Sequence, residues 1–206
     1  KESEFMHLDQ EEMKNKRFLF VAGGVGTAPV YPQLKWVKAH GMKADVIIGT
    51  KTKATLILED MIKEYADNLL VCTDDGSYGM HGLVTDAIKH LVEQKQQKYD
   101  EVVAIGPMIM MKFVSLLTKE LGLKTTVSLN SLMVDGTGMC GACRVTIGGK
   151  TKFTCVDGPE FDAHLVDFDE AMQRQQSYKT QEGRAMLKLQ EGSTHHGGCG
   201  NCGGDR

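Results

Sequence analysis

Short apolar runs alternate with helical stretches over most of the chain, and this alternation restricts the fold more than any other feature of the sequence. The apolar runs have the length of buried strands and lie at residues 17–22, 44–49, 68–73, 101–105 and 124–129. Apolar residues at helical spacing fill the intervals, at residues 28–40, 54–65, 82–93 and 107–121. Strands that alternate with helices form parallel sheets. The pattern therefore predicts an α/β fold with a doubly wound, five-stranded parallel sheet.

The chain changes character after residue 129. Helical spacing stops and glycine becomes frequent, and residues 144–147 and 151–155 flank Gly148-Gly149, a pair typical of a tight hairpin. So small a segment cannot hold a core alone, and a bound metal is expected to stabilise it. We therefore divide the chain into a boundary segment (1–16), the doubly wound domain (17–129), a small metal-binding subdomain (130–170), and a short helix with a flexible tail (171–206).

Charge and hydropathy exclude two classes of partner. The net charge is −3, whereas a protein that binds nucleic acid needs a basic face. No apolar run approaches the roughly 20 residues that span a bilayer, and no secretory signal opens the chain. We therefore expect a cytoplasmic protein without a nucleic-acid or membrane partner. The chain starts at Lys1, and the polar segment 1–16 is interpreted as a truncation boundary.

The glycine-rich turn after the first strand is the first candidate site. It reads Gly23-Gly24-Val25-Gly26-Thr27-Ala28-Pro29, after a strand and before a helix. Gly24 and Gly26 would let the backbone approach a pyrophosphate at the helix N-terminus, although an ordinary turn between a strand and a helix remains the alternative. Turns at residues 73–79 and 106–108 also follow strands, so they would meet at the same edge, where ligands bind.

The cysteines give the strongest chemical signal. Four positions follow the spacing Asp135-x4-Cys140-x2-Cys143-x11-Cys155. Plant-type 2Fe–2S sites follow Cys-x4-Cys-x2-Cys with a later cysteine, so Asp135 stands at the first ligand position. A zinc site with the same four ligands, a site of three cysteines with an incidental Asp135, and free cysteines remain alternatives. Disulfides in a secreted protein are a further alternative.

Three segments carry a resemblance to the NAD-binding domain of ferredoxin reductases. They are FVAGGVGTAPVYP (20–32), TDDGSYGMHGLVTD (73–86) and IGPMIMMKFV (105–114), and they also resemble the electron-transfer subunit of two-subunit dihydroorotate dehydrogenases. The resemblance implies pyrophosphate binding by Gly23, Gly24, Gly26, Thr27 and Pro29. It also implies that Asp75, Gly76, Ser77, Gly106 and Pro107 surround the nicotinamide. It favours NAD(H) over NADP, although Lys51 and Lys53 could pair with a 2′-phosphate.

Residues 128–169 narrow the resemblance further. They resemble the small subunit of NADH-dependent ferredoxin:NADP oxidoreductase, which is also known as the sulfide dehydrogenase small subunit, where an Asp replaces one cluster cysteine. The resemblance implies that Asp135, Cys140, Cys143 and Cys155 hold a 2Fe–2S cluster. It also implies a larger flavin- and iron–sulfur-bearing partner subunit that couples this chain to NADPH and ferredoxin. A sulfide or polysulfide redox subunit and a zinc-binding interaction module are the alternative functions.

Two expectations concern the ends of the chain. The family places FAD on an N-terminal barrel, and only 16 residues precede the first strand here, so we expect the FAD to lie on a part that this sequence lacks. A flavin is needed because nicotinamide transfers a hydride, whereas the cluster takes one electron. At the other end, His195, His196, Cys199 and Cys202 are either incidental residues of a flexible tail or ligands of a second metal site.

Overall fold

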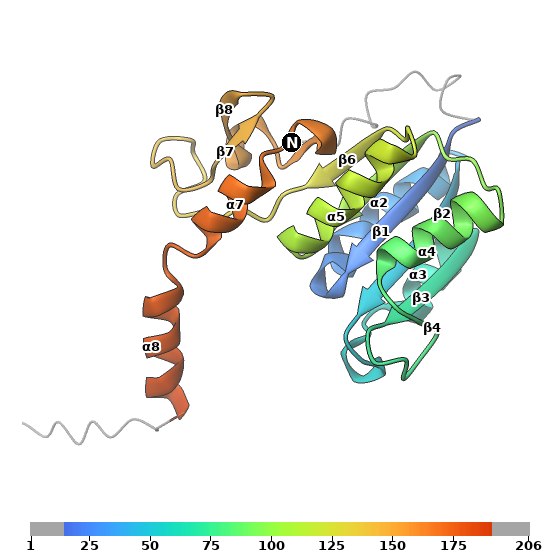
Figure 1. Ribbon diagram of the computed structural model, residues 1–206, viewed down its shortest axis with the longest axis horizontal. Coiled ribbons are helices and arrows are strands. Elements are labelled where there is room, and N and C mark those ends of the chain that lie inside the picture. Colours follow the sequence, from blue (N-terminus) through green and yellow to red (C-terminus); the bar gives the residue numbers. More distant parts are fainter. Residues whose placement is uncertain (1–14, 191–206) are drawn as a thin grey trace, which may run out of the picture.

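Seven strands form one sheet in the computed structural model, which describes residues 15–190 (Figure 1). The order is β4-β3-β2-β1-β5-β6-β9, and all neighbours are parallel except β6 and β9. The bounds are β1 Arg17–Gly23, β2 Lys43–Thr50, β3 Asn68–Thr73, β4 Met80–His81, β5 Glu101–Ile105, β6 Thr125–Ser128 and β9 Glu160–Asp162. The predicted α/β class and its five parallel strands are confirmed.

The two strands that the sequence does not predict lie at the edges of the sheet. β4 pairs through only two residues with β3, and β9 pairs through three residues with β6. Segments of two or three residues are too short to show an alternation of apolar and polar residues, so the sequence does not predict them as strands. Their pairing is decided by which strand the fold places beside them. Because β9 belongs to the glycine-rich segment, that segment is joined to the main sheet by backbone hydrogen bonds.

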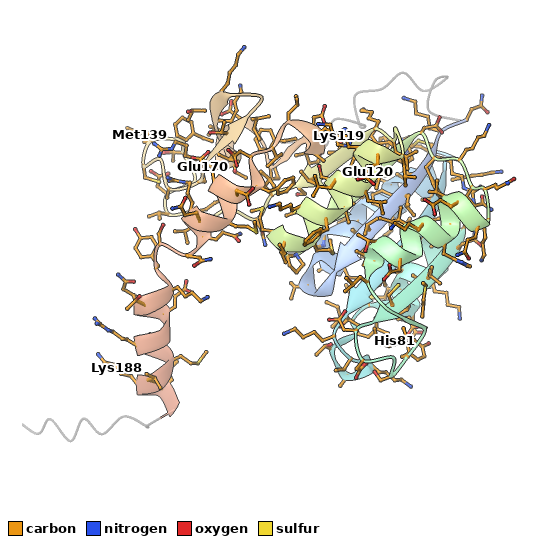
Figure 2. The ribbon with its side chains drawn as sticks, in the orientation of Figure 1. His81, Lys119, Glu120, Met139, Glu170 and Lys188 are labelled. Atoms are coloured by element: carbon orange, nitrogen blue, oxygen red, sulfur yellow. The ribbon has the colours of Figure 1, made fainter. Side chains whose placement is uncertain are left out.

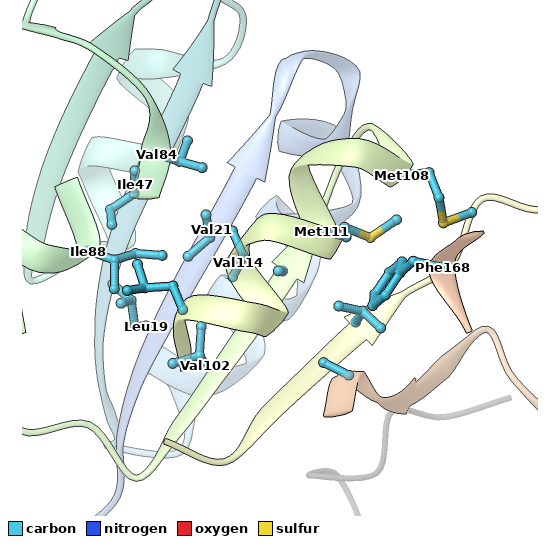
Figure 3. Close-up of a cluster of buried hydrophobic side chains, with 14 of the residues drawn as sticks. Leu19, Val21, Ile47, Val84, Ile88, Val102, Met108, Met111, Val114 and Phe168 are labelled. Carbon is cyan, nitrogen blue, oxygen red and sulfur yellow. The ribbon is translucent and has the colours of Figure 1, made fainter. Parts of the chain in front are cut away.

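Helices cover both faces of the sheet. α2 (Thr27–Ala39) and α3 (Glu59–Tyr65) lie on one face, and α4 (Val84–Lys89) and α5 (Met108–Glu120) lie on the other. Side chains alternate along β1, so Phe18 and Phe20 pack against α2 while Leu19 and Val21 pack against α4 and α5 (Figure 3). All four are fully buried, which explains why β1 reads as a continuous apolar run.

Two helices depart from their predicted bounds. The predicted helix at 54–65 begins only at Glu59, because a 3-10 turn at Lys53–Thr55 and a left-handed Leu58 (φ 57°) precede it. The predicted helix at 82–93 is divided into α4 and a π-helical turn at His90–Gln94. Apolar spacing alone does not distinguish these local windings.

The glycine-rich segment forms a lobe beside β6. It contains β7 (Arg144–Ile147), β8 (Lys150–Phe153), the helical turn α6 (Thr154–Asp157), a 3-10 turn (Ala163–Leu165) and α7 (Phe168–Gln175). The predicted hairpin is present, and Gly148 and Gly149 adopt φ values of 56° and 74°, which the tight turn requires. Its second strand ends at Phe153, so Cys155 lies on α6. Phe168 of α7 packs toward Met108 and Met111 of α5 (Figure 3).

The segment after Gln176 differs from the irregular tail that the sequence predicts. Lys179–Gln190 forms the helix α8, which projects away from the rest of the molecule, with Lys188 near its end (Figure 2). Its mixed polar and apolar sequence gives a weak helical pattern, which explains why the prediction missed it. Among the residues described, no helix has both the length and the apolar character needed to cross a membrane.

A buried carboxylate on β2 links β1, β2 and β3 at the amino ends of these strands, opposite the glycine-rich turns. Asp45 on β2 is 1% exposed. It accepts hydrogen bonds from the Arg17 guanidinium (2.7 Å), the Tyr99 hydroxyl (2.7 Å) and the Asn68 amide (2.8 Å). Burial, followed by the bond to Asp45, raises the pKa of Tyr99. The Asp45 carboxylate therefore has three hydrogen-bond donors, one of them the Arg17 cation, and a buried carboxylate is tolerated when it is partnered in this way.

We predict that Asp45→Ala lowers the free energy of unfolding by about 3 kcal/mol, because three donors lose their acceptor in a buried place. Urea unfolding followed by circular dichroism measures the change. Lys38→Ala is the control, since it removes an exposed ion pair with Asp67 and is expected to cost less than about 1 kcal/mol. Equal losses in the two variants would contradict the assignment of Asp45 as the organising carboxylate.

Candidate functional site

The carboxyl edge of the sheet holds a cavity of about 620 Å³. The turns after β1, β2, β3 and β5 form its floor, and the starts of α4 and α5 form its walls. This is where ligands bind in doubly wound sheets. The lining residues are Gly23, Gly24, Val25, Gly49, Thr50, Lys51, Thr55, Ile57, Asp74, Gly82, Leu83, Val84, Thr85, Pro107, Ile109, Met110 and Phe113.

Glycine is required in the first turn because two backbones meet there. A Cβ on Gly26 would collide with the carbonyl oxygen of Ile105, and a Cβ on Gly106 would lie 2.9 Å from the Cα of Gly23. Gly24 has φ 53° and open space around its Cα, so its backbone faces the cavity without obstruction. The turn therefore combines a close packing position with an exposed backbone, as pyrophosphate binding needs.

Other residues predicted in this turn have structural surroundings. The Thr27 hydroxyl is fully buried and donates to the Gly24 carbonyl at 2.9 Å, which closes the turn at the start of α2. Pro29 lies exposed in the first turn of that helix, where its missing N–H costs nothing. Neither residue lines the cavity, nor does Gly26, whereas Gly23 and Gly24 do.

The turn after β3 is held rigid by its own side chains. The Asp75 carboxylate accepts from the Ser77 N–H (3.0 Å), and bonds from Ser77 lower the pKa of that carboxyl. The Thr73 hydroxyl donates to the Tyr78 carbonyl at 2.7 Å. Asp75, Gly76 and Ser77, which the resemblance places at the nicotinamide, do not line the cavity in this structure, whereas their neighbour Asp74 does.

The end of β2 supplies the polar half of the cavity. Thr50 and Thr55 share a hydroxyl–hydroxyl hydrogen bond of 2.6 Å, and Lys51 stands beside them. Lys53 does not line the cavity, because its ammonium lies over the Tyr78 ring, 4.9 Å from the centroid. Of the two lysines suggested for a 2′-phosphate, only Lys51 is therefore placed to meet one, and Asp74 offers an opposing negative charge.

An apolar half of the cavity escaped the sequence analysis. It includes Ile57, Leu83 and three residues of α5, Ile109, Met110 and Phe113. Phe113 is 54% exposed and Ile109 49% exposed, although both are large and apolar. Their i, i+4 spacing on α5 could have revealed a second apolar stripe, on a face different from that of the buried Met111 and Val114.

In the glycine-rich lobe, Asp135 shapes the loop that carries Cys140. Its two carboxylate oxygens accept from the backbone N–H groups of Thr137 (2.9 Å) and Cys140 (3.0 Å). These bonds, first that from Thr137, hold the pKa of the carboxyl below its usual range. A carboxylate oxygen keeps a further lone pair, so this loop-closing role is compatible with metal binding.

The other ligand candidates converge from two elements. Cys143 is buried, and its sulfur lies 3.3 Å from that of Cys155 on α6. This contact raises the pKa of Cys155. Thr154 fixes the approach, since its hydroxyl donates to the Cys143 carbonyl at 3.0 Å. Cys140 is exposed, and its sulfur accepts from the Ala142 N–H at 3.5 Å.

The structure thus brings together part of the predicted ligand set. Cys143 and Cys155 are in contact through their sulfurs, whereas Asp135 meets Cys140 through the hydrogen bond from the Cys140 N–H to the Asp135 carboxylate. Within residues 15–190 no three His, Cys, Asp or Glu side chains are gathered closely enough to hold a single ion. Three thiols and one carboxylate on a loop with left-handed glycines at 136, 138 and 141 fit a 2Fe–2S cluster by their chemistry. Position 138 also favours glycine through its φ of 84°, and an added Cβ would lie 3.0 Å from a Val156 methyl group.

Helix α5 connects the cavity to the lobe. Its first turns carry Ile109 and Phe113 at the cavity. On other positions of the same helix, Lys112 pairs with Asp169 of α7 at 2.6 Å, and the Ser115 hydroxyl donates to the Ala163 carbonyl at 2.9 Å. A single helix therefore borders both candidate sites. The predicted tail ligands His195, His196, Cys199 and Cys202 lie outside the described residues.

Two stretches of the sequence match known protein families. Residues 20–116 match the family described as "Oxidoreductase NAD-binding domain". Residues 130–167 match the "Iron-sulfur cluster binding domain of dihydroorotate dehydrogenase B". The first match spans the cavity and the second spans the four candidate ligands.

The chain is also similar to individual proteins. A Clostridium beijerinckii protein described as "Uncharacterized protein in adh 3'region" is 62% identical over 205 residues, which is 99% of this chain and 69% of the relative. A Thermotoga maritima protein named "Dihydroorotate dehydrogenase B (NAD(+)), electron transfer subunit homolog" is 52% identical over 164 residues, or 80% of this chain and 57% of the relative. A chain of the NADH-dependent reduced ferredoxin-NADP oxidoreductase structure superposes with a TM-score of 0.75 at 48% identity, over 84% of this chain and 64% of that chain. The present chain therefore spans less than two thirds of the last two proteins.

Gly26→Ala tests the backbone contact in the first turn. We expect the affinity for NADH to fall at least about tenfold, because the new methyl group displaces the turn from Ile105. Isothermal titration calorimetry measures the affinity. Gly183→Ala on α8, where a Cβ meets nothing within 4 Å, is the matched control and is expected to bind as the wild type does. Wild-type affinity in Gly26→Ala would contradict the placement of the nucleotide.

Asp74→Asn tests the choice between NAD(H) and NADP(H). Removing the negative charge from the cavity should raise the ratio of NADPH affinity to NADH affinity by about tenfold, since a carboxylate repels a 2′-phosphate. Glu120→Gln at the C-terminal end of α5 is the matched control, because that carboxylate is exposed and does not line the cavity. An unchanged ratio in Asp74→Asn would show that the adenosine ribose lies elsewhere.

Proposed function

The chain belongs to the family of NAD-binding electron-transfer subunits that carry the iron–sulfur domain of dihydroorotate dehydrogenase B, and from this membership we propose that it moves electrons between NAD(H), a flavin and a 2Fe–2S cluster within a larger oxidoreductase. The observation that carries the proposal is that α5 borders both the nucleotide cavity and the lobe with the cysteines. One helix thereby contacts both candidate sites, and this supports their joint use in electron transfer.

The chemistry of the cofactors assigns the roles. NADH releases a hydride, a flavin accepts it and releases single electrons, and a 2Fe–2S cluster takes one electron at a time. The chain spans 57–69% of the two relatives described above, and we propose that FAD binds to the part that it does not span. This chain's own contribution would be to bind the nicotinamide nucleotide, to exclude water with its apolar residues and to hold the cluster.

We propose specific residues for these tasks. Gly23, Gly24, Gly26, Thr27 and Pro29 form the pyrophosphate turn, in which Thr27 and Pro29 act through the shape of the turn. Asp75, Gly76, Ser77, Gly106 and Pro107 are proposed to border the nicotinamide, and of these only Pro107 lines the cavity in this structure. The cluster ligands are proposed to be Asp135, Cys140, Cys143 and Cys155.

The similarity to the NADH-dependent ferredoxin-NADP oxidoreductase chain suggests the partner. We propose that a larger flavin- and iron–sulfur-bearing subunit couples this chain to NADPH and ferredoxin in the cytoplasm. Exposed apolar side chains on and beside the cluster loop support docking there. Met139, labelled in Figure 2, is 88% exposed, and Val134 is 68% exposed. Partner identity is tested by co-purification from the native organism under anaerobic conditions, where recovery of a flavoprotein without iron would contradict the proposal.

Visible and EPR spectra of protein purified without oxygen test the cluster. We expect absorption between about 400 and 600 nm that bleaches with dithionite, together with an S = 1/2 signal in the reduced state, because a 2Fe–2S cluster takes one electron. A Cys143→Ala variant should lose both signals. Iron and zinc analysis is the control, and a colourless protein with stoichiometric zinc after anaerobic reconstitution would overturn the cluster in favour of a zinc-binding module.

A further inference from the structure

Helix α7 contacts the loop between two proposed cluster ligands. The Arg174 guanidinium donates from one terminal nitrogen to the Gly141 carbonyl (3.1 Å) and to the Ala142 carbonyl (3.4 Å). Gly141 and Ala142 are the two residues that separate Cys140 from Cys143. Arg174 therefore contacts the peptide units whose conformation sets the relative position of the two sulfurs.

The helix that carries Arg174 is itself firmly placed. Phe168 and Ala171 are buried against α5, and Asp167 closes the N-terminus of α7 by accepting from the Glu170 N–H at 3.0 Å. The Asp167 N–H donates to the Thr146 carbonyl of β7 at 2.9 Å. Gln175, next to Arg174, donates to the carbonyl of Asn130, where the glycine-rich segment begins. The helix thus holds the segment at two places.

The charge of Arg174 is not neutralised by the described part of the chain. No carboxylate of residues 15–190 forms an ion pair with it, and its Nε is a buried donor without a partner there. A crevice of about 10 Å³ beside it, lined by Ser131, Ala142, Gln175 and a second cationic residue, Arg144, among others, has room for one water molecule at most. An uncompensated, half-buried cation is costly unless negative charge develops close by.

We propose that Arg174 is a positioning residue for the cluster. Arg174 holds the Cys140–Cys143 loop in its ligating conformation, and its positive charge raises the one-electron reduction potential of the cluster. This inference rests on the proposed function, because it assumes that the four proposed ligands hold a 2Fe–2S cluster. Reduction adds one negative charge to the cluster, and a fixed cation behind the loop stabilises the reduced form more than the oxidised form. The two carbonyl contacts account for the holding role, and the formal charge accounts for the potential.

Two variants of Arg174 separate the roles. Arg174→Gln removes the charge, and Arg174→Lys keeps the charge but loses the planar group that reaches two carbonyls. Arg184→Gln on α8 is the matched control, since it removes the same charge from an exposed position remote from the loop. The full chain is reconstituted anaerobically, the potential is measured by EPR-monitored redox titration, and the rate of cluster loss is measured by absorbance in the presence of a chelator.

We expect Arg174→Gln to shift the one-electron equilibrium about tenfold toward the oxidised cluster, which corresponds to about 59 mV, while Arg174→Lys and Arg184→Gln keep the wild-type potential. Both Arg174 variants should lose the cluster faster than Arg184→Gln does. Complete loss of the cluster from the Arg174 variants alone would support the holding role. A wild-type potential and a wild-type rate of loss in Arg174→Gln, beside an intact S = 1/2 signal in the wild type, would overturn this inference and leave the proposed function standing.

Discussion

The contact between the turns after β1 and β5 is the constraint on which the rest of the structure depends. Gly26 lies against the carbonyl of Ile105, and Gly23 lies against Gly106, so two backbones approach more closely than any side chain would permit. Because the turns fit together in this way, α2 begins directly behind one and α5 directly behind the other. The cavity at the carboxyl edge and the direction of α5 both follow from this contact.

Helix α5, which begins at the second of these turns, contacts the glycine-rich lobe and so sets its position relative to the cavity. One face, with Met111 and Val114, packs against the sheet, while its first turns border the cavity and its middle bonds to Ala163 and to α7. The lobe is too small to hold a core of its own. Its position depends on the pairing of β9 with β6 and on the packing of α7 against α5. These contacts join the segments that match the two families.

Within the lobe, hydrogen bonds between side chains and backbone groups hold the loops in place. Asp135 closes the loop through two N–H groups, Thr154 holds the Cys143 carbonyl, and Arg174 holds the carbonyls of Gly141 and Ala142. Glycines with left-handed conformations make these turns possible. In the part of the chain that the structure describes, Cys140, Cys143 and Cys155 form no disulfide.

Local patterns in the sequence determined the α/β class, the five parallel strands, the glycine-rich turns and the spacing of Asp135, Cys140, Cys143 and Cys155, because each depends on neighbours a few residues apart. The resemblance to a known family added the cofactors. Only the tertiary structure decided which residues line the cavity, since Asp74 replaces Asp75 there and Phe113 enters from α5. It also decided that β9 joins the sheet and that Arg174 reaches Gly141, because contacts across more than 30 residues depend on how packed elements meet, and no local spacing records that.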